Sequence, residues 1–127
     1  MNIVDSSGWL EYFSGGPGAD NFVTPLDTPS ALIVPSITIY EVFKVVLRET
    51  GENEALQAIA AMQKGAVVNL SDRLAMDAAK ISLKRRLPMA DSIIIATAAA
   101  HRCTIWTQDS DFENIQGVKF FPKHDKG

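Results

Sequence analysis

Cysteine and histidine are scarce in this chain, which narrows the chemistry that it can perform. Cys103 is the one cysteine among the 127 residues, so an internal disulfide is excluded and a reducing cytosol fits best. The two histidines, His101 at an expected helix end and His124 in the C-terminal tail, belong to no pattern typical of a catalytic triad. A site that needs thiols or imidazoles, such as a zinc centre, is therefore disfavoured.

Long apolar runs, repeats and linkers are also lacking. The longest apolar run covers residues 92–100 and is too short to span a bilayer. The first residues, Met1-Asn2-Ile3-Val4-Asp5, contain neither a basic segment nor a long apolar stretch, which argues against a signal peptide. We expect one soluble, cytoplasmic domain over residues 1–127, with a flexible tail at residues 122–127 and no membrane contact.

The chain has no large excess of charge of either sign. Its formal net charge is -3, whereas nucleic-acid-binding proteins usually show a basic stripe. The total hides a pattern, because basic residues gather in two places: Lys44 with Arg48, and the group Lys80, Lys84, Arg85 and Arg86. An acidic pocket rimmed by basic residues has the same total as a featureless surface, so net charge does not choose between them.

Short apolar runs alternate with helical segments along the whole chain. The runs at residues 2–4, 31–34, 66–70, 104–106 and 118–121 are predicted to be strands. Helices are expected over residues 8–13, 36–50, 53–64 and 89–102, and from residue 71 or 72 to the interruption at Leu87-Pro88. Residues 19–27 are ambiguous because Pro25 interrupts them. Strands that are unbroken apolar runs separated by helices predict a parallel sheet covered on both faces, which is a three-layer α/β fold.

Acidic side chains fall where such a sheet places its functional residues. Asp5 follows the first strand, and Asp109 and Asp111 follow the fourth, so all three lie at the carboxyl edge. Glu41 lies in the second turn of its helix and Asp91 in the first turn of the helix after Pro88. Carboxylates brought together repel one another unless they are protonated or bridged by a cation. An all-oxygen site without histidine or thiols favours Mg²⁺ or Mn²⁺.

Each acid also has an ordinary structural interpretation. Asp5 suits a helix N-cap, Asp91 suits the positive end of a helix dipole, and Asp109 and Asp111 suit a loop. Glu41 is placed to pair with Lys44 and Arg48 on nearly the same face of its helix. Asp91 fits the structural interpretation least, because its helical neighbours are Ile94, Ile95 and Ala98 and a buried carboxylate needs a partner.

Two further features are assigned to structure. Four aromatic side chains are expected in the core and not as base-stacking platforms: Trp9, Phe13, Tyr40 and Phe43. The segment Gly15-Gly16-Pro17-Gly18 follows a helix and not a strand, which makes it a poor phosphate-binding loop.

Four segments, taken in order, resemble PIN domains of the VapC toxin type. They are Val4-Asp5-Ser6-Ser7 with Trp9-Leu10, Tyr40-Glu41-Val42, Pro88-Met89-Ala90-Asp91-Ser92-Ile93-Ile94-Ile95-Ala96, and Thr107-Gln108-Asp109-Ser110-Asp111-Phe112. The similarity covers residues 5–121. It implies an α/β/α fold with a parallel five-stranded sheet in the order 3-2-1-4-5, and the activity of a metal-dependent endoribonuclease from a toxin–antitoxin pair.

The resemblance also implies roles for individual residues. Asp5, Glu41, Asp91 and Asp109 become an acidic quartet that binds Mg²⁺ or Mn²⁺, and Asp111 is a further candidate ligand. Ser7 and Thr107 become polar supports. The basic residues expected to contact the RNA backbone are Lys44, Arg48, Lys84, Arg85 and Arg86, although a solvated helix face explains them equally well. The implied partners are RNA, a cognate antitoxin and a second copy of the chain.

Two other classes of function stay open at this point. A phosphoacceptor receiver domain has a similar length and would use Asp5, Thr107 and Lys119, but its third strand should end in an acceptor aspartate, where this chain has Asn69-Leu70. A catalytically inactive PIN fold that acts as a binding module is the other alternative, and it leaves the retained acids unexplained.

Overall fold

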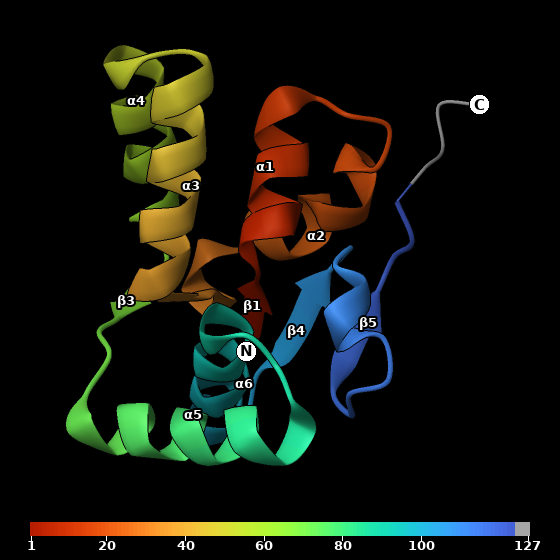
Figure 1. Cartoon of the computed structure of the whole chain (residues 1–127). Helices are drawn as coiled ribbons and strands as arrows, with labels where there is room; N and C mark the ends of the chain where they lie inside the picture. The colour runs from red at the N-terminus through yellow and green to blue at the C-terminus, as the bar shows by residue number, and fades with distance from the viewer. Residues whose placement is uncertain (124–127) are drawn as a thin grey trace.

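The computed structural model describes residues 1–123, and within them five short parallel strands form the centre of the molecule (Figure 1). In one sheet, β4 (Thr104–Thr107) lies between β1 (Asn2–Val4) and β5 (Val118–Phe120). In the other, β2 (Ile33–Pro35) pairs with β3 (Ala66–Val68). A single parallel bridge from Asn2 to Leu32 joins the two. Across that bridge the strand order is 3-2-1-4-5, which confirms the expected topology.

Six helices within the described chain surround these strands. They are α1 (Ser6–Ser14), α2 (Val23–Leu26), α3 (Ser36–Glu49), α4 (Glu52–Met62), α5 (Asp72–Arg85) and α6 (Met89–His101), with 3-10 turns at Ala19–Phe22, Pro29–Ala31 and Ser110–Phe112. In Figure 1, α3 and α4 stand beside α1 on one side of the strands, and α5 crosses α6 on the other. The molecule therefore has the three layers that the sequence predicts.

Two of the three core clusters follow from the alternation of side chains along each strand, and the third lies between α5 and α6. One cluster of buried side chains contains Ile3, Ile33 and Ile105 together with residues of α6. Their sequence neighbours Val4, Val34 and Trp106 belong to the opposite cluster, together with residues of α1, α3 and α4. Residues 3–4, 33–34 and 105–106 of the central strands β1, β2 and β4 are apolar on both faces, because helices cover both sides of the sheet there.

The helix that follows β1 begins two residues earlier than predicted, at Ser6. Its N-cap is Asp5, whose side chain accepts a hydrogen bond from the Gly8 backbone N–H. Gly8 is buried so closely against β1 that an added Cβ would lie 2.6 Å from Val4 Cγ1 and 2.8 Å from Phe22 Cε1. This glycine lets the first turn of α1 pack directly on the end of the strand.

Three expectations from the sequence need correction or fall outside the described residues. β3 is a peripheral strand, and its Val67 is 40% exposed, so coverage of both faces fails there. β2 includes Pro35 in place of residues 31 and 32, because Pro29–Ala31 forms a 3-10 turn. Of the tail expected at residues 122–127, residues 124–127 lie outside the described part. No helix in the described part is long and apolar enough to cross a membrane.

Candidate active site

Four chain segments bring carboxylates to one edge of the strands. Asp5 directly follows β1, and Asp109 lies two residues after β4, which pairs with β1 in parallel. Glu41 projects from α3 and Asp91 from the first turn of α6. The carboxyl ends of parallel strands meet at the same edge, and α1 and α3 begin there, directly after β1 and β2. Helix α6 follows α5 and not a strand, and its first turn nevertheless brings Asp91 to the same edge, beside Asp109.

Asp5 is the most buried of these acids, with 2% of its surface exposed. Its Oδ1 accepts hydrogen bonds from Ser7 Oγ at 2.7 Å and from the Gly8 N–H at 3.0 Å. Its Oδ2 accepts from Thr107 Oγ1 at 2.7 Å. Asp5 is thus both a helix cap and the centre of a polar network, and three neutral donors fix the orientation of its carboxylate.

The Ser7 and Thr107 hydroxyls connect Asp5 to the loop after β4. Ser7 Oγ accepts from the Gln108 N–H at 3.2 Å, and Thr107 Oγ1 accepts from the Asp109 N–H at 2.9 Å. Each hydroxyl has a single proton and donates it to Asp5, so their mutual contact of 3.3 Å is secondary. The position of Asp109 is therefore tied to the position of Asp5 through Thr107.

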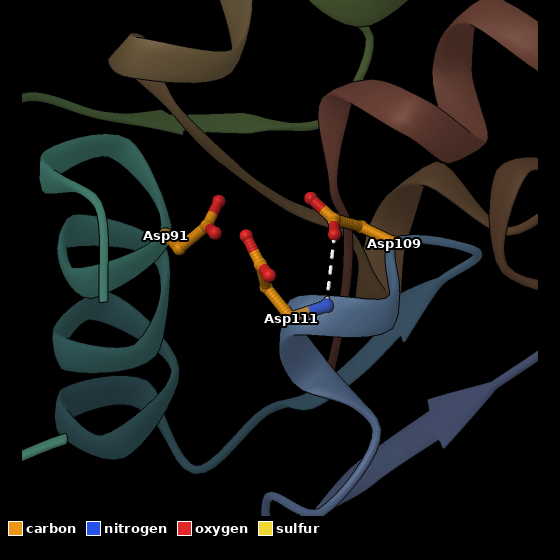
Figure 2. Close-up of side chains that lie close together, drawn as sticks. All are labelled: Asp91, Asp109 and Asp111. Atoms are coloured by element: carbon orange, nitrogen blue, oxygen red, sulfur yellow. Dashed lines mark hydrogen bonds between the residues drawn. The ribbon is translucent and has the colours of Figure 1, made fainter. Parts of the chain in front are cut away.

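Three aspartates form the tightest acidic group (Figure 2). Asp91, Asp109 and Asp111 each place one carboxylate oxygen within 4.8 Å of the other two. Figure 2 shows Asp91 pointing from α6 toward the turn that carries Asp109 and Asp111. The Asp111 N–H donates to Asp109 Oδ1 at 2.9 Å, and this cap turns the chain so that the Asp111 side chain faces α6.

Glu41 reaches the same region from α3 and is partly buried. Burial raises its pKa, the Ser6 hydroxyl beside it lowers the pKa, and the negative charge of Asp109 raises it. Ser6 was not among the site residues expected from the sequence. The run Asp5-Ser6-Ser7 contained the signal, because successive residues at the start of a helix point to different sides.

Burial and like charge dominate the electrostatics of the site. Burial raises the pKa of Asp5 to about 6, against the lowering effect of its three donors. The pKa of Asp91 rises to about 7, first through burial and then through the charges and contacts of Asp109, Asp111 and Asp5. The ion pairs found within residues 1–123, Arg48 with Glu49 and Arg73 with Asp77, involve none of these acids. In particular, the expected alternative pairing of Glu41 with Lys44 and Arg48 is not formed.

The donor set fits a hard divalent cation. Every side-chain donor in the acidic group is a carboxylate oxygen, which Mg²⁺ and Mn²⁺ prefer. In addition, Asp91 Oδ2 is fully buried and has no hydrogen-bond partner among the described residues. A buried polar atom without a partner is rare and calls for an explanation such as an ion or water. A cation bound here would satisfy that atom and offset the repulsion among the acids.

The basic residues assigned to RNA contact are all solvent-exposed. Lys44 and Arg48 lie on α3, while Lys84, Arg85 and Arg86 lie at the end of α5. One aromatic expectation is wrong here. Tyr40 was expected in the core, yet it is 59% exposed, and the Lys44 ammonium lies 5.6 Å from the centre of its ring. Trp9, by contrast, is buried as expected.

Comparison with known proteins agrees with this architecture. The sequence profile of the PIN domain matches residues 3–118, which include all five acids. No curated protein matches the chain. The profile match spans most of the chain, and it leaves no place for the receiver-domain alternative.

Several solved structures share the fold. A toxin–antitoxin complex from Klebsiella pneumoniae is 24% identical, with a TM-score of 0.80 over 97% of this chain and 100% of that one. VapC20 of Mycobacterium tuberculosis, described as a toxin that cleaves the sarcin–ricin loop, is 16% identical, with a TM-score of 0.75 over 91% and 95%. DNA-bound VapBC from Salmonella typhimurium is 14% identical, with a TM-score of 0.73 over 96% and 98%.

Proposed function

This chain belongs to the PIN-domain family, and we propose that it is a metal-dependent endoribonuclease that acts in the cytoplasm as the toxin of a toxin–antitoxin pair. The observation that carries the proposal is the unpaired acidic group at the carboxyl edge of the strands. Asp91, Asp109 and Asp111 gather their oxygens within 4.8 Å, and no described ion pair neutralises them. A protein keeps such a group against its own repulsion when the group has a use for a cation.

The proposed reaction is hydrolysis of an RNA phosphodiester by in-line attack of water. A new bond forms between the water oxygen and phosphorus, the bond to the leaving ribose oxygen breaks, and that oxygen takes up a proton. Bound Mg²⁺ or Mn²⁺ would lower the pKa of the attacking water and offset charge on the phosphate. No side chain needs to form a covalent intermediate.

The residues of this chain supply position and charge. We assign Asp5, Asp91 and Asp109 as cation ligands, with Glu41 at the edge of the site and Asp111 as a further ligand. Ser7 and Thr107 hold the Asp5 carboxylate in one orientation through hydrogen bonds of 2.7 Å. Because these supports are neutral hydroxyls, they orient the acid without cancelling the charge that a cation needs.

The basic side chains give the substrate its approach. Lys44 and Arg48 on α3 lie one and two turns beyond Glu41, and Lys84, Arg85 and Arg86 end the helix that precedes α6. Exposed lysine and arginine side chains suit contacts with phosphates, which position a strand without reading its sequence. We therefore assign these five residues to the RNA backbone.

A groove beside the site supports the assignment of a protein antitoxin. It has a volume of about 780 Å³ and begins at Ser6, Ser7 and Gln108. Its apolar lining includes Leu10, Phe13, Val45 and Val46, and its acidic residues are Glu11, Glu49 and Glu54. This surface suits an apolar segment of a partner that also carries cationic side chains. An arginine from that segment would reach the acidic group and replace the cation there.

A second copy of the chain is the other proposed partner. Large apolar side chains are exposed along α5 and at the start of α6: Met76 is 59% exposed, Leu83 86% and Met89 71%. Exposed apolar surface of this kind is typical of protein interfaces. Sedimentation tests this, and a monomer at micromolar concentration that Leu83→Glu leaves unchanged would contradict the homodimer.

The decisive test of the nuclease is cleavage of labelled single-stranded RNA by Asp91→Asn. Asn keeps the shape of the side chain and loses the charge, so we expect cleavage to disappear while the fold is retained. Asp77→Asn is the matched control, because Asp77 lies on the surface of α5 in an ion pair with Arg73. EDTA should abolish cleavage by the wild-type protein, and Mg²⁺ or Mn²⁺ should restore it.

The possible results separate the alternatives. Full activity of Asp91→Asn, or activity that persists in EDTA, would contradict the metal mechanism. A wild-type protein that binds RNA but cleaves none in either metal would favour the inactive binding module. The toxin assignment is tested separately, by adding the protein encoded beside this one. If the neighbouring protein does not inhibit cleavage, the toxin role is wrong and the nuclease assignment stands.

A further inference from the structure

Tyr40 immediately precedes Glu41 on α3, and its side chain is exposed. We propose that its ring is a stacking platform for one nucleobase of the single-stranded RNA that the site cleaves. The inference rests on the proposed ribonuclease function and adds a residue that contacts the substrate away from the reacting phosphate. Because every base has a π-face, such a platform accepts any base.

The position of Tyr40 on α3 carries the first step of the argument. It precedes Glu41, and consecutive residues of a helix project about 100° apart. Glu41 turns inward toward Ser6 and Asp109, whereas the Tyr40 side chain is 59% exposed. Glu41 and Tyr40 therefore belong to the same turn of α3, with Glu41 facing the acidic residues and the Tyr40 ring facing solvent on the adjacent side. A strand whose phosphate is bound by the acidic residues would pass this ring.

The charges around the ring carry the second step. Lys44 follows Tyr40 by four residues, and its ammonium lies 5.6 Å from the ring centroid. Arg48 follows by another four, so a ladder of one ring and two cations runs along the exposed face of α3. A ring followed by cations suits a base and the neighbouring phosphates of a single strand. Arg48 also pairs with Glu49, whereas Lys44 has no ion pair among the described residues, and an apolar protein partner would leave its ammonium without a counter-charge.

The packing of α3 carries the third step. The helix is anchored by Thr38 and Val42, which are fully buried, and Tyr40 belongs to none of the three core clusters. Replacing Tyr40 is therefore expected to leave the fold intact. A loss of substrate binding on replacement would then report the lost contact and not a damaged helix.

The experiment measures kcat and KM for a labelled, unstructured oligoribonucleotide in Mn²⁺, using the wild-type chain and three variants. Stacking on one base corresponds to a change of about 5- to 150-fold in affinity. Tyr40→Ala is expected to raise KM by that factor with little change in kcat. Tyr40→Phe should retain the wild-type KM, and Tyr40→Leu, which keeps apolar bulk without a π-face, should behave like Tyr40→Ala.

A control variant and a modified substrate sharpen the test. Leu47 lies two turns further along the same face and is 42% exposed, so Leu47→Ala should leave KM unchanged. The substrate is also made as a set of oligonucleotides that each lack one base. At one position, loss of the base should raise the KM of the wild type but not the KM of Tyr40→Ala. Such non-additivity shows that the ring and that base interact directly.

The outcomes distinguish this inference from the proposed function. If the wild type cleaves RNA and Tyr40→Ala or Tyr40→Leu has the same KM, the platform is wrong and the nuclease stands. A change in sedimentation on replacing Tyr40 would instead identify the ring as a subunit contact and overturn the platform. If the wild type cleaves no RNA, the proposed function and the platform fall together.

Discussion

Asp91→Asn should make the metal-free protein more stable, although we expect the same change to abolish the proposed RNA cleavage. In the folded chain, burial and the charges of Asp109, Asp111 and Asp5 raise the pKa of Asp91 from 3.8 to about 7. At pH 8 the carboxylate is ionised in the folded and the unfolded states, and its ionisation costs free energy in the folded state alone. Asn has a similar shape and no charge, so the variant avoids that cost.

The size of the effect follows from the shift. For a group fully shielded from solvent, a rise in pKa from 3.8 to about 7 would lower the free energy of unfolding by roughly 4 kcal/mol. Asp91 is only partly buried and shares its titration with its neighbours, so solvent screening reduces the figure, and we expect about 1–2 kcal/mol. For a chain of this length that gain raises the Tm by roughly 3–8 °C.

The assay is thermal unfolding of both proteins in EDTA at pH 5 and pH 8, followed by the same scans with Mg²⁺ or Mn²⁺. The variant should be the more stable protein at pH 8 in EDTA, and the difference should shrink at pH 5, where wild-type Asp91 is protonated. A saturating cation should reverse the order, because it binds the folded wild type and stabilises it. If Asp91→Asn is less stable in EDTA at pH 8, the carboxylates do not repel as described.

Three further expectations concern the same region. In EDTA, the free energy of unfolding of the wild type should fall as the pH rises from 5 to 7. The pKa of Asp5 is about 6 in the folded state, so the folded protein retains a proton in this range that the unfolded chain has already lost. Urea titrations at several pH values measure this slope. Thr107→Val should cost about 2 kcal/mol by the same assay and Thr107→Ser much less, because the lost hydroxyl leaves buried groups unpaired. Gly8→Ala should cost about 1–3 kcal/mol despite the better helix propensity of alanine, since its Cβ would overlap Val4 and Phe22; a more stable Ala variant would contradict that packing.

Much of the fold was predictable because its signals are local. Apolar runs bounded by capping residues predict β1 and β4, and the pairing of their carboxyl ends follows from the parallel arrangement. Ser71 caps α5 as its side chain suggests. The exposure of β3 was not predictable, because Val67 in a peripheral strand looks the same in sequence as a valine in a central one.

The candidate site was predictable to the level of segments but not of contacts. Strand ends indicated the neighbourhood of Asp5 and Asp109, and the structure brings Asp109 and Asp91 together. The direction of the Asp111 side chain depends on the turn that Asp109 caps. Residue spacing alone does not predict the geometry of that turn. Tyr40 was misplaced because helical periodicity gives the angle between side chains and not which side of the helix meets the core. The roles of all these residues stay predictions.

The way in which the acids are held explains why the site remains open to a cation. A lysine beside Asp5 would orient its carboxylate equally well, and it would lower the pKa and stabilise the metal-free fold. It would also neutralise the charge that attracts a divalent ion. The chain instead uses the hydroxyls of Ser7 and Thr107 and the backbone N–H of Gly8, which fix geometry and leave the net charge intact. The raised pKa of Asp5 is the consequence, because neutral donors do not compensate for burial. On the proposed function, the lower stability of the metal-free protein and the readiness of the site to bind a cation would have the same origin in this network.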